Sequence, residues 1–293
     1  MMKNILFVGN GKKDKDMVYS KRIIDSLFKK GFKVVVDNLD LVIDGVTEFA
    51  SCDTLKTVEM MIVLGGDGTI LTYARKYEKY NYPIMGINLG RIGALAVAEL
   101  DDYELYLDKL LNNDFVEIKH LALDGKIIRA NGTSIKYTAY NDVVIHRGAS
   151  PKILRINIAV NNSDFSEVYT DGIIVATPTG SSAYNLSAGG PLLSTNSKCY
   201  VITPVCPQSK TFSSLVVSNE DEVHLTVGDN PNVDEDKNVV TVDGYVEYPI
   251  NANDTVLIKK SKKNLKMVQF SQQKSLYDSV YKAVVSINRK GEK

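Results

Sequence analysis

The sequence has no excess of either charge. Lysine plus arginine and aspartate plus glutamate both total 35, so the formal net charge is zero at pH 7. Proteins that bind nucleic acid through its phosphates usually carry a basic excess or a basic stripe. The densest basic run, at 259–263, is short and typical of a solvated turn. The charge balance therefore argues against a nucleic-acid partner.

Cysteine and long apolar runs are also scarce. The three cysteines, Cys52, Cys199 and Cys206, are odd in number and widely spaced, which argues against a disulfide framework. The three histidines form no metal-ligand spacing with them, so the residues predict no metal site in the protein itself. No stretch approaches the roughly 20 apolar residues that a membrane helix needs, and no secretory signal is recognisable. We therefore expect a cytoplasmic protein with no membrane partner.

The first third of the chain alternates apolar runs with helical patterns. Strands are predicted at 4–9, 33–37, 60–64 and 84–88, and helices at 16–30, 69–77 and 103–111. This alternation indicates parallel strands joined by right-handed crossovers. We expect an α/β domain with a Rossmann-like parallel sheet over residues 1–113.

The composition changes after Asn113. Short alternating runs broken by Gly, Asn, Asp and Pro follow, which predicts a β-rich domain over 114–270. The polar stretch at 228–238 is predicted to be an exposed hairpin loop. A helical pattern at 273–288 predicts that the C-terminal segment 271–293 packs back on the first domain.

The pentapeptide GGDGT at 65–69 lies between a predicted strand and a predicted helix. Glycine lets the backbone approach a phosphate closely, and a helix N-terminus directs its free N–H groups at the same place. Asp67 would then be held where it could take a proton from an attacking hydroxyl or help to hold a metal ion. A plain strand-to-helix turn is the other interpretation, but such turns seldom need three glycines.

Two further polar segments are less specific when each is taken alone. The segment at 177–184, TPTGSSAY, offers several hydroxyls and one aromatic ring, which suits a nucleotide. A loop that caps a helix, with Tyr184 in the core, explains the segment equally well. The pair Asn141-Asp142 could hold ribose hydroxyls, although a polar strand edge is the better explanation of the pair by itself. Gly9-Asn10-Gly11 lacks the third glycine of a dinucleotide fingerprint and is predicted to be a turn.

These motifs occur together in the order and spacing of one family. GGDGT at 65–69, NLGRIG at 88–93, Asn141-Asp142 and the segment from 170 to 192 resemble the NAD kinases, with a looser match at 242–244. GGDG alone also occurs in diacylglycerol and sphingosine kinases, and in similar form in phosphofructokinases. The TPTGSSAY segment is the motif that separates the NAD kinases from these relatives.

The resemblance implies the reaction and the residues that perform it. A phosphoryl group passes from ATP, or from another triphosphate or polyphosphate, to the 2′-OH of the adenosine ribose of NAD. Mg²⁺ or another divalent metal is carried by the donor. Asp67 is the implied catalytic base, and the implied phosphate-donor loop is Gly65, Gly66, Gly68 and Thr69. The implied NAD-binding residues are Asp67, Gly68, Asn141, Asp142, Lys152, Tyr169, Asp171, Ser182, Ala183, Tyr184 and Ser187.

The resemblance also implies an architecture, with NAD bound in a cleft between the two domains and a homodimer or homotetramer formed through the β-rich domain. The sequence departs from the family pattern at three positions. Ala94 replaces a usual phenylalanine, Gln208 a usual histidine and Tyr245 a frequent glutamine. Ala94 removes an aromatic wall from the ligand cleft, and Tyr245 could partly refill it.

Two other functions remain as alternatives at this point. A lipid or sugar kinase would share the GGDG loop but would leave TPTGSSAY unexplained. A non-catalytic NAD sensor would keep the cleft; the retained Asp67 argues against this function, and Ala94 weakly favours it.

Overall fold

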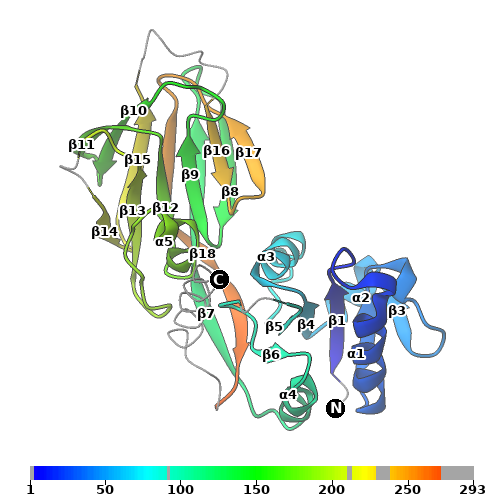
Figure 1. Cartoon of the computed structure of the whole chain (residues 1–293). Coiled ribbons are helices and arrows are strands. Elements are labelled where there is room, and N and C mark those ends of the chain that lie inside the picture. Colours follow the sequence, from blue (N-terminus) through cyan, green and yellow to red (C-terminus); the bar gives the residue numbers. More distant parts are fainter. Residues whose placement is uncertain (1–2, 91–92, 210–212, 229–237, 272–293) are drawn as a thin grey trace, which may run out of the picture. The chain divides into compact units, whose positions relative to one another are not determined.

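The computed structural model describes residues 3–90, 93–209, 213–228 and 238–271. The chain forms two compact units, one of Met1–Lys119 with Leu265–Lys293 and the other of His120–Asn264. The boundaries fall inside two long strands, β7 (Val116–Ile128) and β18 (Thr255–Gln269). Each of these strands therefore contributes residues to both units (Figure 1).

The first unit is built on a parallel sheet. Its strands lie in the order β3-β2-β1-β4-β5, and β5 also pairs in parallel with β6 and with β18. The central strands β1 and β4 are buried, as expected for parallel strands with both faces covered. The strands are β1 (Asn4–Gly9), β2 (Lys33–Val36), β3 (Thr47–Phe49), β4 (Met60–Leu64), β5 (Ile84–Asn88) and β6 (Ala98–Glu99).

Helices pack on both faces of this sheet. Ile23, Ile24 and Leu27 of α1 join a core cluster that contains Ile87 of β5. Because neighbouring strand residues point to opposite faces, Gly86 faces the other side, where it lies against Ile70 of α3. The helical segments of this unit are η1 (Lys15–Met17), α1 (Val18–Lys29), η2 (Leu39–Leu41), α2 (Cys52–Thr57), α3 (Asp67–Lys76) and α4 (Tyr103–Leu111).

The second unit contains two sets of strands with one core between them. One set has the order β11-β10-β15-β18, and β7 pairs with β18 and β8; the other is β14-β13-β12-β9-β16-β17. Apolar residues of both sets, such as Ile156 and Ile173, belong to a single buried cluster. The remaining elements are β8 (Ser134–Ala139), β9 (Asp142–His146), β10 (Leu154–Val160), β11 (Ser163–Thr170), β12 (Gly172–Ala176), β13 (Cys199–Val205), β14 (Leu215–Ser218), β15 (Glu222–Val227), β16 (Val239–Val242), β17 (Val246–Pro249), η3 (Gly180–Ser182) and α5 (Tyr184–Ser187).

The predicted α/β sheet followed by a β-rich region is confirmed, and its details differ at two helix starts. The first helix, predicted at 16–30, begins only at Val18, because Asp16 and Met17 have φ angles of 57° and 55°. The helix predicted at 69–77 begins two residues earlier, at Asp67. The predicted helix at 273–288 lies outside the described residues, as do residues 229–237 of the predicted loop at 228–238.

Candidate active site

The GGDGT loop joins the carboxyl end of β4 to the N-terminus of α3. Gly66 is the N-cap of this helix and Asp67 its first residue, so the carboxylate lies where the helix dipole is positive. The backbone N–H of Gly65 donates to the carbonyl of Ile87 (2.9 Å), which holds the loop against β5. The end of the parallel sheet therefore carries a glycine turn, a helix N-terminus and one acidic side chain.

The carboxylate of Asp67 is held by backbone N–H groups of the segment that follows β5. Its Oδ2 accepts from Ala94 N (2.7 Å) and its Oδ1 from Leu95 N (3.1 Å). Burial raises the pKa of Asp67 above its ordinary value, and the hydrogen bonds from the backbone N–H groups of Ala94, Leu95 and Ala96 offset part of this rise. Each oxygen keeps lone pairs that these bonds do not use, so Asp67 can still accept a further hydrogen bond.

The glycines of the loop differ in what surrounds them. A Cβ on Gly65 would stand 2.6 Å from the Thr69 side chain, so close packing requires this glycine. A Cβ on Gly66 or Gly68 would meet nothing within 4 Å. Thr69, which is predicted to belong to the phosphate-donor loop, faces the segment after β1. Its hydroxyl accepts a hydrogen bond from Nδ2 of Asn10 (3.1 Å). Open backbone at two glycines beside a helix N-terminus leaves room for an anionic ligand.

In the second unit, Asp142 begins β9 beside a hairpin turn, and Asn141 directly precedes the strand. Asp243 in that turn has a φ of 51°, and its carboxylate accepts from the backbone N–H groups of Tyr140, Asn141 and Asp142 at 2.7–3.1 Å. Burial raises the pKa of Asp142 to about 7, and the nearby Asp243 carboxylate adds to the shift. Oδ1 of Asn141 is buried without a partner among the described residues. An unsatisfied amide oxygen beside a buried carboxyl group is suited to receiving ligand hydroxyls.

The TPTGSSAY loop packs directly on this pair. Thr177 N donates to the carbonyl of Asn141 (2.8 Å), and the Thr177 hydroxyl donates to the carbonyl of Tyr140 (2.8 Å). Within β9 and β12, Asp142 lies opposite Ala176. The structure therefore brings together two motifs that are more than 30 residues apart in the sequence.

The loop presents its C-terminal residues to solvent. The side chain of Tyr184 is 46% exposed, so the alternative interpretation of this residue as core is wrong. Ala183 and Ser187 are also exposed, and the hydroxyl of Ser182 donates to the carbonyl of Thr179 (3.0 Å). An exposed ring above an ordered loop is the arrangement that a stacking contact with a ligand needs.

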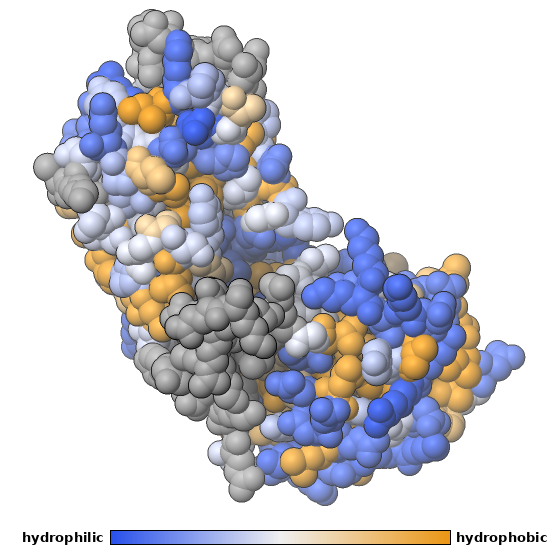
Figure 2. Space-filling model, in the orientation of Figure 1, coloured by the Kyte–Doolittle hydropathy of each residue, from blue (hydrophilic) through white to orange (hydrophobic). Residues whose placement is uncertain are grey.

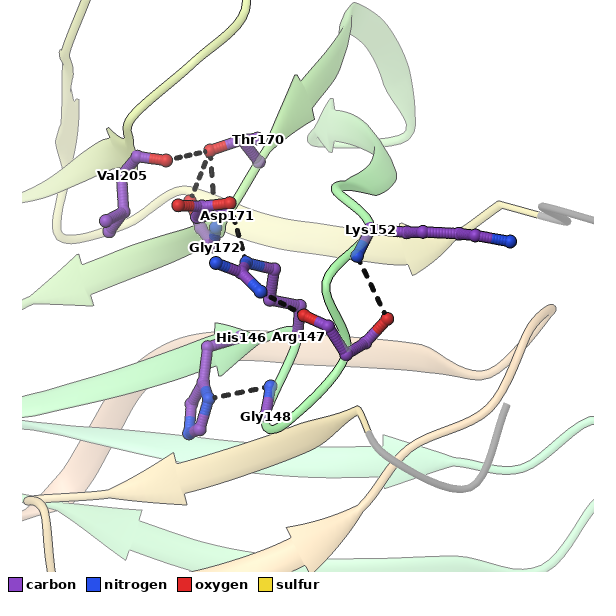
Figure 3. A network of polar contacts seen from close by, with 9 residues as sticks. His146, Arg147, Gly148, Lys152, Thr170, Asp171, Gly172 and Val205 are labelled. Atoms are coloured by element: carbon purple, nitrogen blue, oxygen red, sulfur yellow. Dashed lines mark hydrogen bonds and ion pairs between the residues drawn. The ribbon is translucent and has the colours of Figure 1, made fainter. Parts of the chain in front are cut away.

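The remaining predicted residues lie at the opposite end of β12. Asp171 precedes the strand and pairs with Arg147, whose Nε is 2.7 Å from Oδ1. Arg147 also donates to the carbonyl of Ser150, and the backbone N–H of Lys152 donates to the hydroxyl of Ser150 (Figure 3). Tyr169 is 41% exposed at the end of β11. The backbone at 152, 169 and 171 therefore lies about four strand residues away from Asn141 and Asp142, and the side chain of Lys152 points away from Asp171 (Figure 3).

Some residues that shape the site carry no clear sequence signal. Asn185 is buried and joins three segments, because its amide donates to the carbonyls of Ser181 and Pro191 and accepts from the Thr203 hydroxyl. His120 contacts the Thr179 hydroxyl at 3.0 Å, and burial lowers the pKa of this histidine to about 4. The spacing of polar residues does not reveal these pairings, since Thr203 and Thr179 are 18 and 59 residues away from Asn185 and His120.

Two absences concern only the described part of the chain. Residues 3–90, 93–209, 213–228 and 238–271 contain no group of three or more His, Cys, Asp or Glu side chains that could hold a metal ion. Over the same residues, no helix is both long and apolar enough to span a membrane.

A parallel sheet that ends in a glycine turn with an acidic helix N-terminus, together with a hydroxyl-rich loop on a β unit, defines a nucleotide-binding kinase. The ATP-NAD kinase N-terminal domain matches residues 5–115, and the ATP-NAD kinase C-terminal domain matches residues 140–270. The NAD kinase of Lachnoclostridium phytofermentans is 34% identical over 270 residues, covering 92% of this chain and 94% of that protein. The NAD kinase of Natranaerobius thermophilus is 33% identical over 279 residues, covering 94% and 96%.

The chain therefore belongs to the NAD kinase family, and it is an ATP-dependent enzyme that phosphorylates NAD to NADP. The two alternatives, a lipid or sugar kinase and a non-catalytic NAD sensor, are therefore wrong.

Solved structures agree with this fold at lower identity. Yeast NADH kinase complexed with NADH has a TM-score of 0.86 at 19% identity, covering 98% of this chain and 88% of that chain. An NAD kinase from Archaeoglobus fulgidus in complex with ATP has a TM-score of 0.73 at 22% identity, covering 96% and 99%.

Proposed function

We propose that Asp67 is the general base of the phosphoryl transfer. The observation that supports this role is the fixed carboxylate at the start of α3, held by Ala94 N and Leu95 N with lone pairs still free. The 2′-OH of the adenosine ribose attacks the terminal phosphorus of the donor. As the new O–P bond forms, the bond to the departing ADP breaks and the hydroxyl proton passes to Asp67. Positioning contributes most of the rate in such reactions, because the transition state is loose.

The donor phosphates are proposed to bind at the glycine loop. Gly66 and Gly68 leave open backbone beside the α3 N-terminus, where anions are favoured. ATP is proposed to arrive with Mg²⁺ or another divalent ion, which neutralises the phosphoryl oxygens.

NAD is proposed to bind the second unit through two groups of side chains. Asn141 and Asp142 would hold ribose hydroxyls, and Tyr184 would stack on a ring with Ser182, Ala183 and Ser187 beside it. The buried free oxygen of Asn141 supports the first contact and the exposed ring of Tyr184 the second. Lys152, Tyr169 and Asp171 are proposed to touch a more distant part of NAD. On this basis residues 1–113 and 114–270 are the donor and NAD-binding domains.

The enzyme is further proposed to be a homodimer or homotetramer in the cytoplasm. The edge strands β11 and β14 of the second unit carry the exposed Phe165 and Val216, which is typical of strands that a second copy could cover. On the face shown in Figure 2, hydrophobic residues are scattered among hydrophilic ones. Light scattering at micromolar concentration tests this proposal, and a monomeric mass would contradict it.

Replacement of the proposed base is the decisive experiment for the catalytic role. Asp67→Asn keeps the shape and one acceptor oxygen but removes the base and its charge. We expect kcat to fall by at least ~10²-fold, which is the lower end for loss of a general base. The NAD dissociation constant should change much less, because the ring contacts belong to the Tyr184 loop. NADP formed from NAD, ATP and Mg²⁺ is measured with an NADP-specific dehydrogenase, and near-normal turnover would exclude Asp67 as the base.

A further inference from the structure

The segment between β5 and β6 lies against the sheet and against Asp67. Val97 N donates to the carbonyl of Gly86 (3.0 Å), and a Cβ on Gly86 would stand 2.9 Å from the Cα of Ala96. The missing side chain at Gly86 therefore lets the segment approach β5 closely. This approach brings the N–H groups of Ala94 and Leu95 to the carboxylate of Asp67.

Gly93 lies in this segment beside the carboxylate of Asp67. A Cβ built on Gly93 would stand 2.2 Å from Oδ1 of Asp67 and 2.8 Å from its Cγ. A Cβ atom does not come within 3.0 Å of a heavy atom in a residue that is not its chain neighbour. The Asp67 side chain is short, and each of its two oxygens accepts a backbone N–H. Moving the carboxylate away from position 93 would therefore break at least one of these hydrogen bonds. The carboxylate of Asp67 therefore occupies the volume that a side chain at position 93 would fill.

We propose that Gly93 is a positioning residue for the reaction, because its missing side chain leaves the space in which the Asp67 carboxylate is held by Ala94 N and Leu95 N. A side chain at this position forces the carboxylate away from both N–H groups. The carboxylate then loses the bonds that fix its direction and favour its charged form. This inference rests on the proposed role of Asp67 as the base.

The test is Gly93→Ala in the full-length enzyme, with Gly228→Ala as the matched control. The three atoms nearest to a Cβ built on Gly228 all belong to the flexible side chain of Arg155, at 3.0–3.4 Å. We expect Gly93→Ala to lower kcat by at least ~10-fold and to change the KM for NAD less than threefold. The acid limb of the pH–kcat profile should move to higher pH, because the carboxylate loses N–H donors. A merely structural defect would lower the plateau without moving that limb.

A second measurement does not depend on activity. Gly93→Ala should lower the melting temperature of the wild-type chain, and it should lower it by less than half as much in an Asp67→Ala background, where the clashing carboxylate is gone. An equal fall in both backgrounds, or an unchanged kcat in Gly93→Ala, overturns the proposal. If the coupling is present but Asp67→Asn keeps its turnover, the geometry is right and the proposed base is wrong.

Discussion

Gly180 lies directly on the backbone of Asn141. A Cβ built on Gly180 would stand 2.1 Å from the Asn141 carbonyl oxygen and 2.8 Å from its Cα. The close approach explains how the hydroxyl-rich loop and the start of β9 form one surface. The same oxygen accepts the backbone N–H of Thr177, so neither segment can move alone.

Gly180→Ala should separate the two segments. Overpacking of a well-packed region costs about 1–3 kcal/mol, and we expect a loss of unfolding free energy in this range. NAD affinity should also fall, because the Asn141 side chain and the Tyr184 loop would no longer lie at the distance that lets both contact the same ligand. Urea unfolding and calorimetric titration with NAD measure the two effects. Unchanged stability would show that the loop can withdraw without cost.

Tyr184→Ala should weaken NAD binding by about 1–2 kcal/mol, which is the range for an aromatic contact with its buried area. The melting temperature of the ligand-free enzyme should change little, because the ring is 46% exposed. Phe28→Ala removes a similarly exposed ring from α1, at 45% exposure and outside the predicted NAD contacts and the proposed oligomer strands, and serves as the control. A large loss of stability with unchanged affinity would contradict the proposed stacking role.

Asp142 should make the stability of the protein depend on pH. Its folded-state pKa of about 7 lies above the ordinary value of 3.8, so the folded state retains a proton that the unfolded chain releases. Stability should therefore fall as pH rises from about 4 to 7 and then level off, with a total change of at most about 4 kcal/mol. Asp142→Asn should remove this slope and weaken NAD binding.

Unfolding free energies measured by urea between pH 5 and pH 8 test the slope. Asp53→Asn is the control, because the Asp53 side chain is 92% exposed and pairs with Lys56 one helical turn away (2.9 Å). If the slope of Asp142→Asn matches that of the wild type, the carboxyl group of Asp142 is ionised throughout this range.

Arg147→Ala should act through Asp171. The Asp171 carboxylate would lose its ionic partner at 2.7 Å, at a stability cost of about 1 kcal/mol or less because both side chains are one-third exposed. The KM for NAD should rise in Arg147→Ala and in Asp171→Ala, and the double variant should be no worse than Asp171→Ala. Additive effects in the double variant would mean that Arg147 contacts NAD independently.

The elements that the sequence predicts well are those whose pattern is local. The buried runs of β1, β4 and β5 and the glycine turn before α3 need no distant partner to be recognised. The proximity of Asn141 to the TPTGSSAY loop could not be predicted from a local pattern, because it depends on the pairing of β9 with β12. The role of Asp243 depends likewise on a hairpin turn with positive φ at two successive residues.

The site residues show the same limit. Asp67 is prominent in the sequence because of its glycines, yet its bonds to Ala94 N and Leu95 N involve main-chain atoms that leave no mark in residue identity. The sequence also does not distinguish an exposed Tyr184 from a buried one, since the same aromatic residue suits both. Burial at these positions is decided by tertiary packing.

The hydrogen bonds from the backbone to the Asp67 carboxylate have a consequence for which substitutions the enzyme can accept. The bonds to the carboxylate come from the backbone at 94 and 95, so the side chain at 94 is free to change without disturbing them. We expect that the departure at Ala94, where the family resemblance implies phenylalanine, leaves the hold on the Asp67 carboxylate intact. A library of variants at position 94 would therefore change the side chain while keeping the backbone N–H that holds Asp67.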